Sequence, residues 1–77
     1  MIGQQVKSIW ERELALAEVG GDEDFFALGG HSLIMQRIQV AIKEEVGVEV
    51  AMDELFRRAT VNQITDHLEH LQTSTPA

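Results

Sequence analysis

The sequence predicts an all-helical bundle of three longer helices and one short helix. Apolar residues recur at steps of three and four in three separate stretches, which is the spacing of a helix that buries one face. Val46, Val48 and Val50 alternate like a strand, but no second strand-like segment exists to pair with them, so we expect an extended linker there. With 77 residues, the chain has room for one domain.

The first predicted helix covers about residues 3–16, and a long loop follows over residues 20–30. The helix is indicated by the apolar positions Ile2, Val6, Ile9, Trp10 and Leu14. Two glycines and three acidic residues open the loop, and we expect a solvated acidic turn there rather than a calcium loop. Because so long a loop in a small domain must be tied down, at least one of Phe25 and Phe26 should be buried.

The second predicted helix begins at Ser32 and stops at Gly47, which suits a left-handed helix end. Its core stripe is read as Ile34, Ile38, Ala41, Ile42 and Val46. A short helix then fits residues 53–58, with Leu55 and Phe56 facing inward. Thr60 is a suitable N-cap for the last helix, whose apolar stripe is Val61, Ile64, Leu68 and Leu71. We assign residues 1–72 to the folded domain and residues 73–77 to a flexible tail or linker.

The charge balance restricts the partners of this protein. Thirteen acidic and six basic residues give a net charge of −7, which argues against nucleic acid and anionic membranes and favours partners with basic surfaces. No apolar run approaches the ~20 residues of a membrane span, and no signal-peptide pattern is present. We therefore expect a cytoplasmic monomer. The chain has no cysteine, so any thiol chemistry needs a sulfur from outside the polypeptide.

The most informative stretch is residues 28–33, where two glycines deliver Ser32 to the start of a helix. The first turn of a helix has unpaired N–H groups and a partial charge of about +0.5, so a phosphate on Ser32 would be favourably placed. The alternative is an unmodified N-cap, worth about 1 kcal/mol. Met35 stands where the glutamate of a capping box would be. These residues alone permit either interpretation.

Leu33 and Met35 lie off the predicted core stripe, near the helix start. They are either peripheral core residues or exposed contacts for a partner, and two exposed apolar side chains beside a functional serine would form a docking surface. Together with Gly29, Gly30 and His31 they make up the predicted docking residues.

Over residues 9–64 the chain resembles the peptidyl carrier (thiolation) domains of nonribosomal peptide synthetases. The matching landmarks are Ile9-Trp10, Leu14, Leu16, Val19-Gly20, Asp22 to Phe26, Leu28-Gly29-Gly30-His31-Ser32-Leu33, Ile42, Gly47-Val48-Glu49-Val50, Leu55-Phe56 and Thr60-Val61. The resemblance implies a small four-helix carrier-protein bundle. It also implies that Ser32 receives 4′-phosphopantetheine from coenzyme A, and that aminoacyl or peptidyl groups are held on this arm as thioesters.

The partners implied by the resemblance are a magnesium-dependent phosphopantetheinyl transferase, an adenylation enzyme, and condensation, thioesterase or tailoring enzymes. His31 is more like peptidyl carriers than acyl carriers, which usually have aspartate before the serine. The chain departs from the family pattern at Ala51 and Ala59, where prolines are common, and at the basic pair Arg57-Arg58. These departures concern loop geometry and partner choice.

Four other interpretations of the sequence need to be considered. A hydrolase is disfavoured because Ile34 stands where a nucleophile elbow needs glycine, so we expect a carrier without catalytic activity. His67 and His70 could share a helix face, but two histidines without a third ligand do not predict a metal site. An acyl carrier of a polyketide or hybrid pathway, and an unmodified helical interaction module, stay as alternatives.

Overall fold

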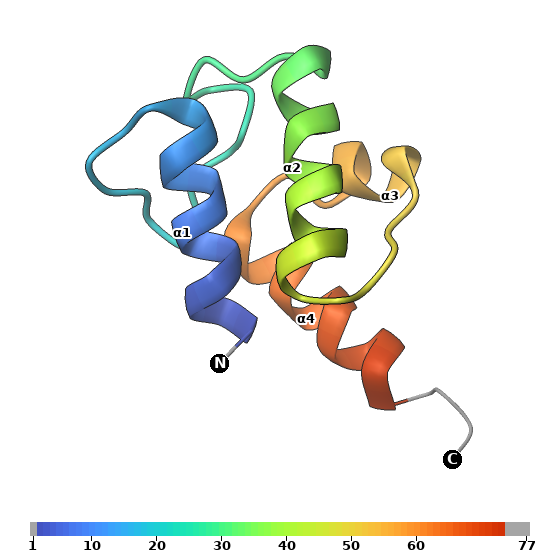
Figure 1. The fold of residues 1–77 in the computed structure, drawn as a ribbon. Coiled ribbons are helices and arrows are strands. Elements are labelled where there is room, and N and C mark those ends of the chain that lie inside the picture. The colour runs from blue at the N-terminus through green and yellow to red at the C-terminus, as the bar shows by residue number, and fades with distance from the viewer. Residues whose placement is uncertain (1, 74–77) are drawn as a thin grey trace.

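The structure is a computed structural model that describes residues 2–73, and in that range it contains four helices (Figure 1). These are α1 (Ile2–Leu14), α2 (Ser32–Glu45), α3 (Met52–Arg57) and α4 (Val61–Thr73). Residues 47–51 carry no regular secondary structure and form the predicted extended linker. The predicted all-helical bundle is therefore confirmed. Helix α4 runs one residue past the predicted domain, and residues 74–77 of the predicted tail lie outside the described part.

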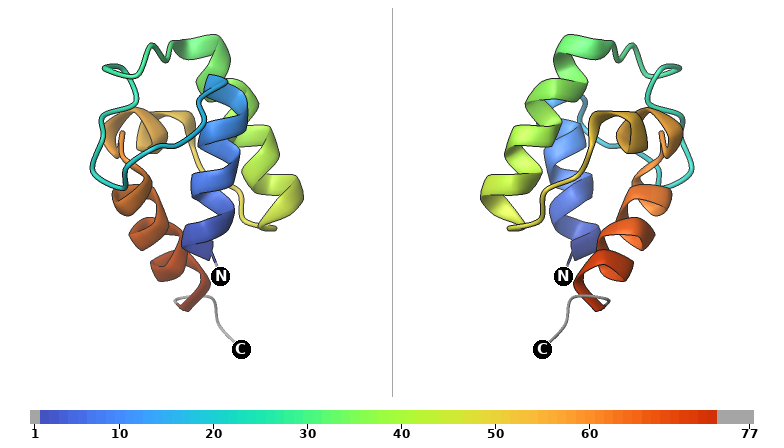
Figure 2. Two further views of the ribbon diagram at one scale, coloured as in Figure 1. Left: turned by 90° about the vertical axis from the view of Figure 1, so that its left-hand side faces the viewer. Right: turned by 90° about the vertical axis from the view of Figure 1, so that its right-hand side faces the viewer.

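The three longer helices enclose one apolar core. Helix α1 packs against α2 and α4, and α2 also packs against the short α3 (Figure 2). Trp10 and Phe25 are the largest fully buried side chains, and the core also contains Val6, Ile9, Val19, Met35, Ile38, Ala41, Ile42, Val50, Leu55, Ala59, Val61, Ile64 and Leu68. Within residues 2–73, none of the helices combines the length and apolar character needed to cross a membrane.

The buried face of α2 differs from the predicted one by a single residue at its start. Met35 is fully buried, whereas Ile34 is only partly buried at the edge of the core. Met35 lies three residues before Ile38, so it falls on the same side of the helix as the rest of the stripe. The prediction that Met35 contacts a docking partner is therefore wrong, because its side chain has no exposed surface.

The predicted helix ends are borne out at Gly47 and Thr60. Gly47 has a φ of +84°, and its N–H donates to the Ile42 carbonyl at 3.1 Å, which closes α2. The Thr60 hydroxyl accepts a hydrogen bond from the Gln63 N–H at 3.1 Å, as an N-cap of α4 should.

Helix α1 ends at a residue that carries backbone strain. Ala15 has a φ of +57°, a conformation that costs about 1–2 kcal/mol for a residue with a Cβ. Replacing Ala15 with glycine should therefore raise the free energy of unfolding by about 1 kcal/mol, less than the strain itself because glycine also frees the unfolded chain. Urea denaturation measures this change. Ala17→Gly, at a nearby exposed position without positive φ, is the control and should give no gain. A loss of stability in Ala15→Gly would contradict the assignment.

Candidate functional site

The long loop between α1 and α2 is held against the junction of α3 and α4. The Phe25 N–H donates to the Ala59 carbonyl at 2.7 Å, and the Asn62 N–H donates to the Gly21 carbonyl at 3.0 Å. The Asn62 side-chain amide also donates to the Asp22 carboxylate at 2.9 Å. Because the loop is tied down at two places, the segment that leads into α2 has a fixed starting point.

The acidic residues of this loop stay exposed, as expected, but they also bind backbone N–H groups. The Glu23 carboxylate accepts from the Gly20 N–H at 2.6 Å. The Asp24 carboxylate accepts from the N–H groups of Phe26 and Ala27, at 2.9 and 3.1 Å. These carboxylates stabilise the turns of the loop. None of the described residues forms a group of three histidine, aspartate or glutamate side chains that could hold a metal ion.

Phe25 anchors the loop in the core, which confirms that one of the two phenylalanines is buried. Its ring meets Trp10 edge-on at 5.4 Å between centroids. A Cβ added to Gly30 would collide with the Phe25 ring, so the backbone of residue 30 rests directly on that ring. Gly29 has a φ of +91°, which favours glycine. The two glycines thus serve different purposes, close packing and backbone conformation, and together they bring the chain to the start of α2.

Ser32 is the first residue of α2, and His31 is the N-cap. His31 has extended backbone angles (φ −148°, ψ 177°), and its carbonyl accepts the Met35 N–H at 3.0 Å. Its side chain makes no capping hydrogen bond. The Ser32 side chain is exposed, and its hydroxyl makes no hydrogen bond to any residue in the part of the chain that the structure describes. The alternative in which Ser32 serves as the N-cap is therefore wrong.

The surroundings of Ser32 suit an added negative charge. The N–H groups at the start of a helix have no intrahelical acceptor, and the aligned peptide dipoles give this end a partial positive charge. No acidic residue lies in the first turn of α2, so no carboxylate already occupies this field. A phosphate joined to the Ser32 hydroxyl would be stabilised by about 0.3–1 kcal/mol in such a position.

Exposed apolar side chains occur directly after Ser32 and in the loop that precedes α2. The Leu33 side chain is 59% exposed and Phe26 is 46% exposed. The Phe26 ring stacks on Phe56 of α3, with 5.7 Å between centroids and 13° between planes. We call Phe26, Leu33 and Phe56 the docking face. The sequence predicts a contact surface at Leu33 but does not identify Phe26, because the pattern does not say which of two adjacent phenylalanines points outward. Phe56 was expected to face inward like Leu55, whereas it is only partly buried.

The chain also matches a known protein family. Residues 4–68 match the model of the family described as "Phosphopantetheine attachment site". The chain belongs to this family. The cofactor of such a carrier domain is 4′-phosphopantetheine, derived from coenzyme A, and the chemistry it supplies is a flexible arm that ends in a thiol. The predicted resemblance to peptidyl carrier domains is thereby confirmed.

A dimodular nonribosomal peptide synthase of Bacillus subtilis (strain 168) is 44% identical to this carrier domain over 64 residues. The match covers 83% of this chain but only 3% of that protein, so the chain spans a small part of the relative. BlmI, a type-II acyl-carrier-protein from Streptomyces verticillus involved in bleomycin biosynthesis, has a similar structure with a TM-score of 0.88 and 32% identity, covering 92% of this chain and 86% of BlmI.

A chain in the structure of the phosphopantetheine transferase Sfp with coenzyme A and a peptidyl carrier protein gives a TM-score of 0.87 at 26% identity. The match covers 91% of both chains. The residues of this carrier domain fit the cofactor on their own geometry as well. An exposed hydroxyl with no hydrogen bond to the described residues stands at a helix N-terminus that attracts anions.

Proposed function

We propose that Ser32 is the attachment point of 4′-phosphopantetheine and that residues 1–72 act as a peptidyl carrier. In this role the protein holds aminoacyl or peptidyl groups as thioesters during nonribosomal peptide synthesis. The observation that carries the proposal is the exposed Ser32 hydroxyl, which caps nothing and begins α2 of a domain in the attachment family.

The attachment step can be written from the chemistry of a hydroxyl and a pyrophosphate. The Ser32 Oγ forms a bond to the phosphorus nearest the pantetheine, the bridging P–O bond of coenzyme A breaks, and adenosine 3′,5′-bisphosphate leaves. The hydroxyl proton must be accepted by the transferase or by water, because no described side chain bonds to Ser32. The chain positions the Ser32 hydroxyl in the partial positive charge at the start of α2, while the catalytic groups come from the partner.

The loading of the arm and the transfer of its cargo also require catalytic groups from other proteins. A general base or acid would have to lie within hydrogen-bond reach of the reacting group, and the described residues place none there. We therefore propose that the protein is a non-catalytic shuttle. We also propose that it acts in the cytoplasm. Its partners would be a phosphopantetheinyl transferase, an adenylation enzyme, and condensation, thioesterase or tailoring enzymes.

The docking face gives these partners a surface to recognise. Gly29, Gly30 and His31 lead the backbone to Ser32, and Leu33 exposes more than half of its side chain directly after it. Exposed apolar side chains beside a reacting group are typical contacts of a partner enzyme. We propose that partners cover the docking face whenever they approach the arm.

Leu33→Arg should slow cofactor loading by about tenfold, because an arginine replaces an apolar contact worth roughly 1–2 kcal/mol in the complex. Loading kinetics with purified transferase measure the effect. The urea midpoint should stay within error of the wild type, since Leu33 contributes little to the core. Val40→Arg, at a comparably exposed position on the same helix outside the docking face, is the matched control and should load at the wild-type rate, because loading precedes any contact of the attached arm with α2. Equal kinetics for Leu33→Arg and the wild type would remove Leu33 from the docking face.

A thiol titration tests the proposed function itself. The chain has no cysteine, so the unmodified protein should react with no thiol reagent. After incubation with coenzyme A, magnesium and a broad-specificity transferase, and removal of free coenzyme, we expect one thiol per chain. Ser32→Ala should give none. A folded wild-type protein that gains no thiol would favour the remaining alternative, in which the docking face serves an unmodified interaction module.

A further inference from the structure

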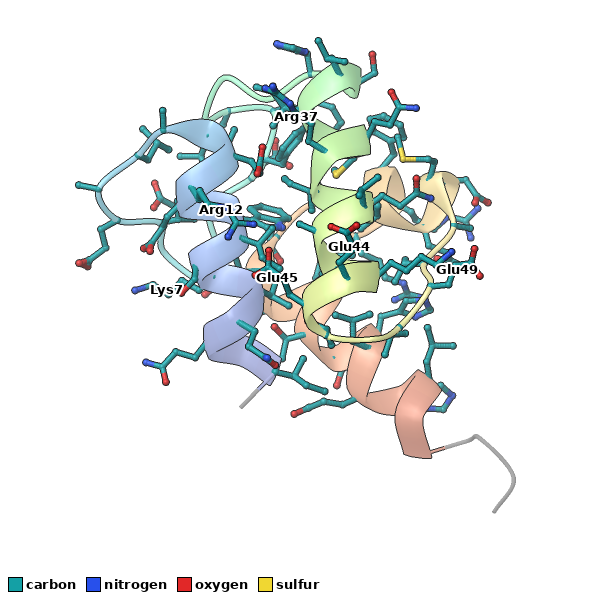
Figure 3. All side chains as sticks on the ribbon, viewed as in Figure 1. Lys7, Arg12, Arg37, Glu44, Glu45 and Glu49 are labelled. Carbon is teal, nitrogen blue, oxygen red and sulfur yellow. The ribbon has the colours of Figure 1, made fainter. Side chains whose placement is uncertain are left out.

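A groove on the side of the molecule between α1 and α2 is not used by the proposed docking face. It encloses about 820 Å³, and its walls include Arg12 and Ala15 of α1 and Gln36, Arg37, Val40 and Glu44 of α2. In Figure 3, Arg37 lies toward the start of α2 and Glu44 lies toward its end, with Arg12 facing them from α1. We call this the α1–α2 groove.

The α1–α2 groove has opposite charges at its two ends and an apolar side chain between them. Arg37 and Glu44 are exposed, and neither makes an ion pair or side-chain hydrogen bond within residues 2–73. Val40 lies between them and is 50% exposed. An unpaired cation, an exposed apolar residue and an unpaired anion thus follow one another along α2.

The wall on the α1 side is held in place by an ion pair. The Arg12 guanidinium donates to the Glu45 carboxylate at 2.6 Å and so joins α1 to α2. Hydrogen bonding to Glu45 raises the pKa of Arg12 above its ordinary value, so the guanidinium stays charged throughout the working range of the protein. Glu13, which also lines the groove, contacts the Arg12 guanidinium at 3.4 Å, so Glu44 is the carboxylate of the lining that these pairs leave unengaged.

Ser32 is the first residue of α2 and lies one helical turn before Gln36, which lines the groove. Gln36, Val40 and Glu44 follow Ser32 at steps of four, and each step turns about 40° around the axis, so they form a row that slants from Ser32 into the groove. At 1.5 Å per residue, Val40 lies about 12 Å and Glu44 about 18 Å along the axis from Ser32. A phosphopantetheine arm contains two amide links and, like an extended peptide of similar length, spans about 15–20 Å. An arm attached at Ser32 can therefore reach the far end of the groove.

We propose that the α1–α2 groove is the resting site of the aminoacylated arm, and that Glu44 binds the α-ammonium group of its cargo. This inference depends on the proposed attachment of the cofactor at Ser32. The loaded arm carries a negative phosphodiester at one end and a positive ammonium at the other, and the groove has Arg37 and Glu44 in the matching order. Gln36, one turn from Ser32, can donate to the phosphodiester or to the hydroxyl beside it, and Val40, two turns away, can cover the methylene groups further along the arm.

Weak contacts are sufficient for such a site. A tethered group is present at an effective concentration in the millimolar range, so a few hydrogen bonds and one apolar contact keep it bound for much of the time. Release needs no conformational change of the bundle, so a partner that covers the docking face can still draw the arm out. The inferred cargo is an amino acid with a free amine, because a simple acyl chain offers nothing for the Glu44 carboxylate.

Amide NMR spectra of the ¹⁵N-labelled protein test this proposal. Intact mass first establishes that one phosphopantetheine, or a hydrolysis-resistant aminoacyl amide analogue of it, is attached. We then expect backbone shifts at residues 36, 37, 40 and 44 in the loaded form. Glu44→Gln should reduce the shifts for the aminoacyl analogue but leave those for an acetyl analogue unchanged. Lys43→Gln, on the same helix outside the groove, is the matched control and should change neither.

Thiol alkylation of the unacylated arm gives a second readout. The unacylated arm lacks the ammonium but keeps its contacts with Arg37 and Val40, and while these hold it the thiol reacts only through the released fraction. Val40→Asp should therefore speed alkylation by roughly threefold to tenfold, and an unchanged rate would remove Val40 from the resting site. Modified protein whose shifts stay confined to residues 30–35, or appear on α3 instead, would overturn this inference alone. Folded protein that gains no mass would overturn the proposed function and this inference together.

Discussion

Phe25→Ala should leave the protein largely unfolded at room temperature. Phe25 is fully buried, its ring meets Trp10 edge-on, and the Gly30 backbone rests against it. Removing a buried phenylalanine costs about 3–5 kcal/mol. The single core of a domain this small rarely supplies more than about 3–5 kcal/mol in total. Loss of cooperative urea unfolding, followed by helical circular dichroism and Trp10 fluorescence, is the expected result.

Phe26→Ala is the matched control for this prediction. The neighbouring ring is 46% exposed and stacks on Phe56, a contact worth about 0.5–1.5 kcal/mol. This variant should stay folded with a modestly lower urea midpoint. Equal losses in the two variants would mean that the loop is not anchored through Phe25 in the way that the structure shows.

Met35→Glu should be the second severe variant. Met35 is fully buried on the core face of α2, so an ionised carboxylate there would lose its hydration without gaining a partner. An uncompensated buried charge costs about 3–5 kcal/mol. Thermal unfolding followed by circular dichroism should show no folded baseline near neutral pH.

Gln36→Glu separates burial from charge, because it introduces the same carboxylate at an exposed position one residue further on. It should unfold within about 0.5 kcal/mol of the wild type. Burial raises the pKa of the carboxyl introduced by Met35→Glu above the value of about 4.3 that glutamate has in an unfolded chain, so that variant should regain stability relative to the wild type as the pH falls from neutral toward about 4.3. A Met35→Glu protein as stable as Gln36→Glu would contradict the buried position of Met35.

Helical periodicity predicts most of this fold. The apolar stripes of α1 and α4 fix their buried faces, and glycine and threonine mark where α2 ends and α4 begins. The sequence does not show which residue near the start of α2 is buried, because Ile34 and Met35 both lie three or four residues before Ile38. Only packing against the other helices decides that Met35 is the buried one.

The candidate site was predictable in part. The serine, the glycine pair and the helix start are local features, so they can be read from consecutive residues. The contacts between Asp22 and Asn62, and between Phe26 and Phe56, join segments far apart in the chain, and no local pattern encodes them. The role of His31 as the N-cap also escaped prediction, since serine is the preferred cap and histidine is not.

The most direct test of the central claim is the intact mass of the folded protein after incubation with coenzyme A, magnesium and a broad-specificity phosphopantetheinyl transferase. We expect complete conversion to a species heavier by one phosphopantetheine, with the added mass on the peptide that contains Ser32, and no change for Ser32→Ala. The Ser32→Ala variant should unfold at nearly the same urea concentration as the wild type, because its hydroxyl bonds to no described residue. An unmodified wild-type chain, or full modification of Ser32→Ala at another residue, would contradict the assignment of Ser32.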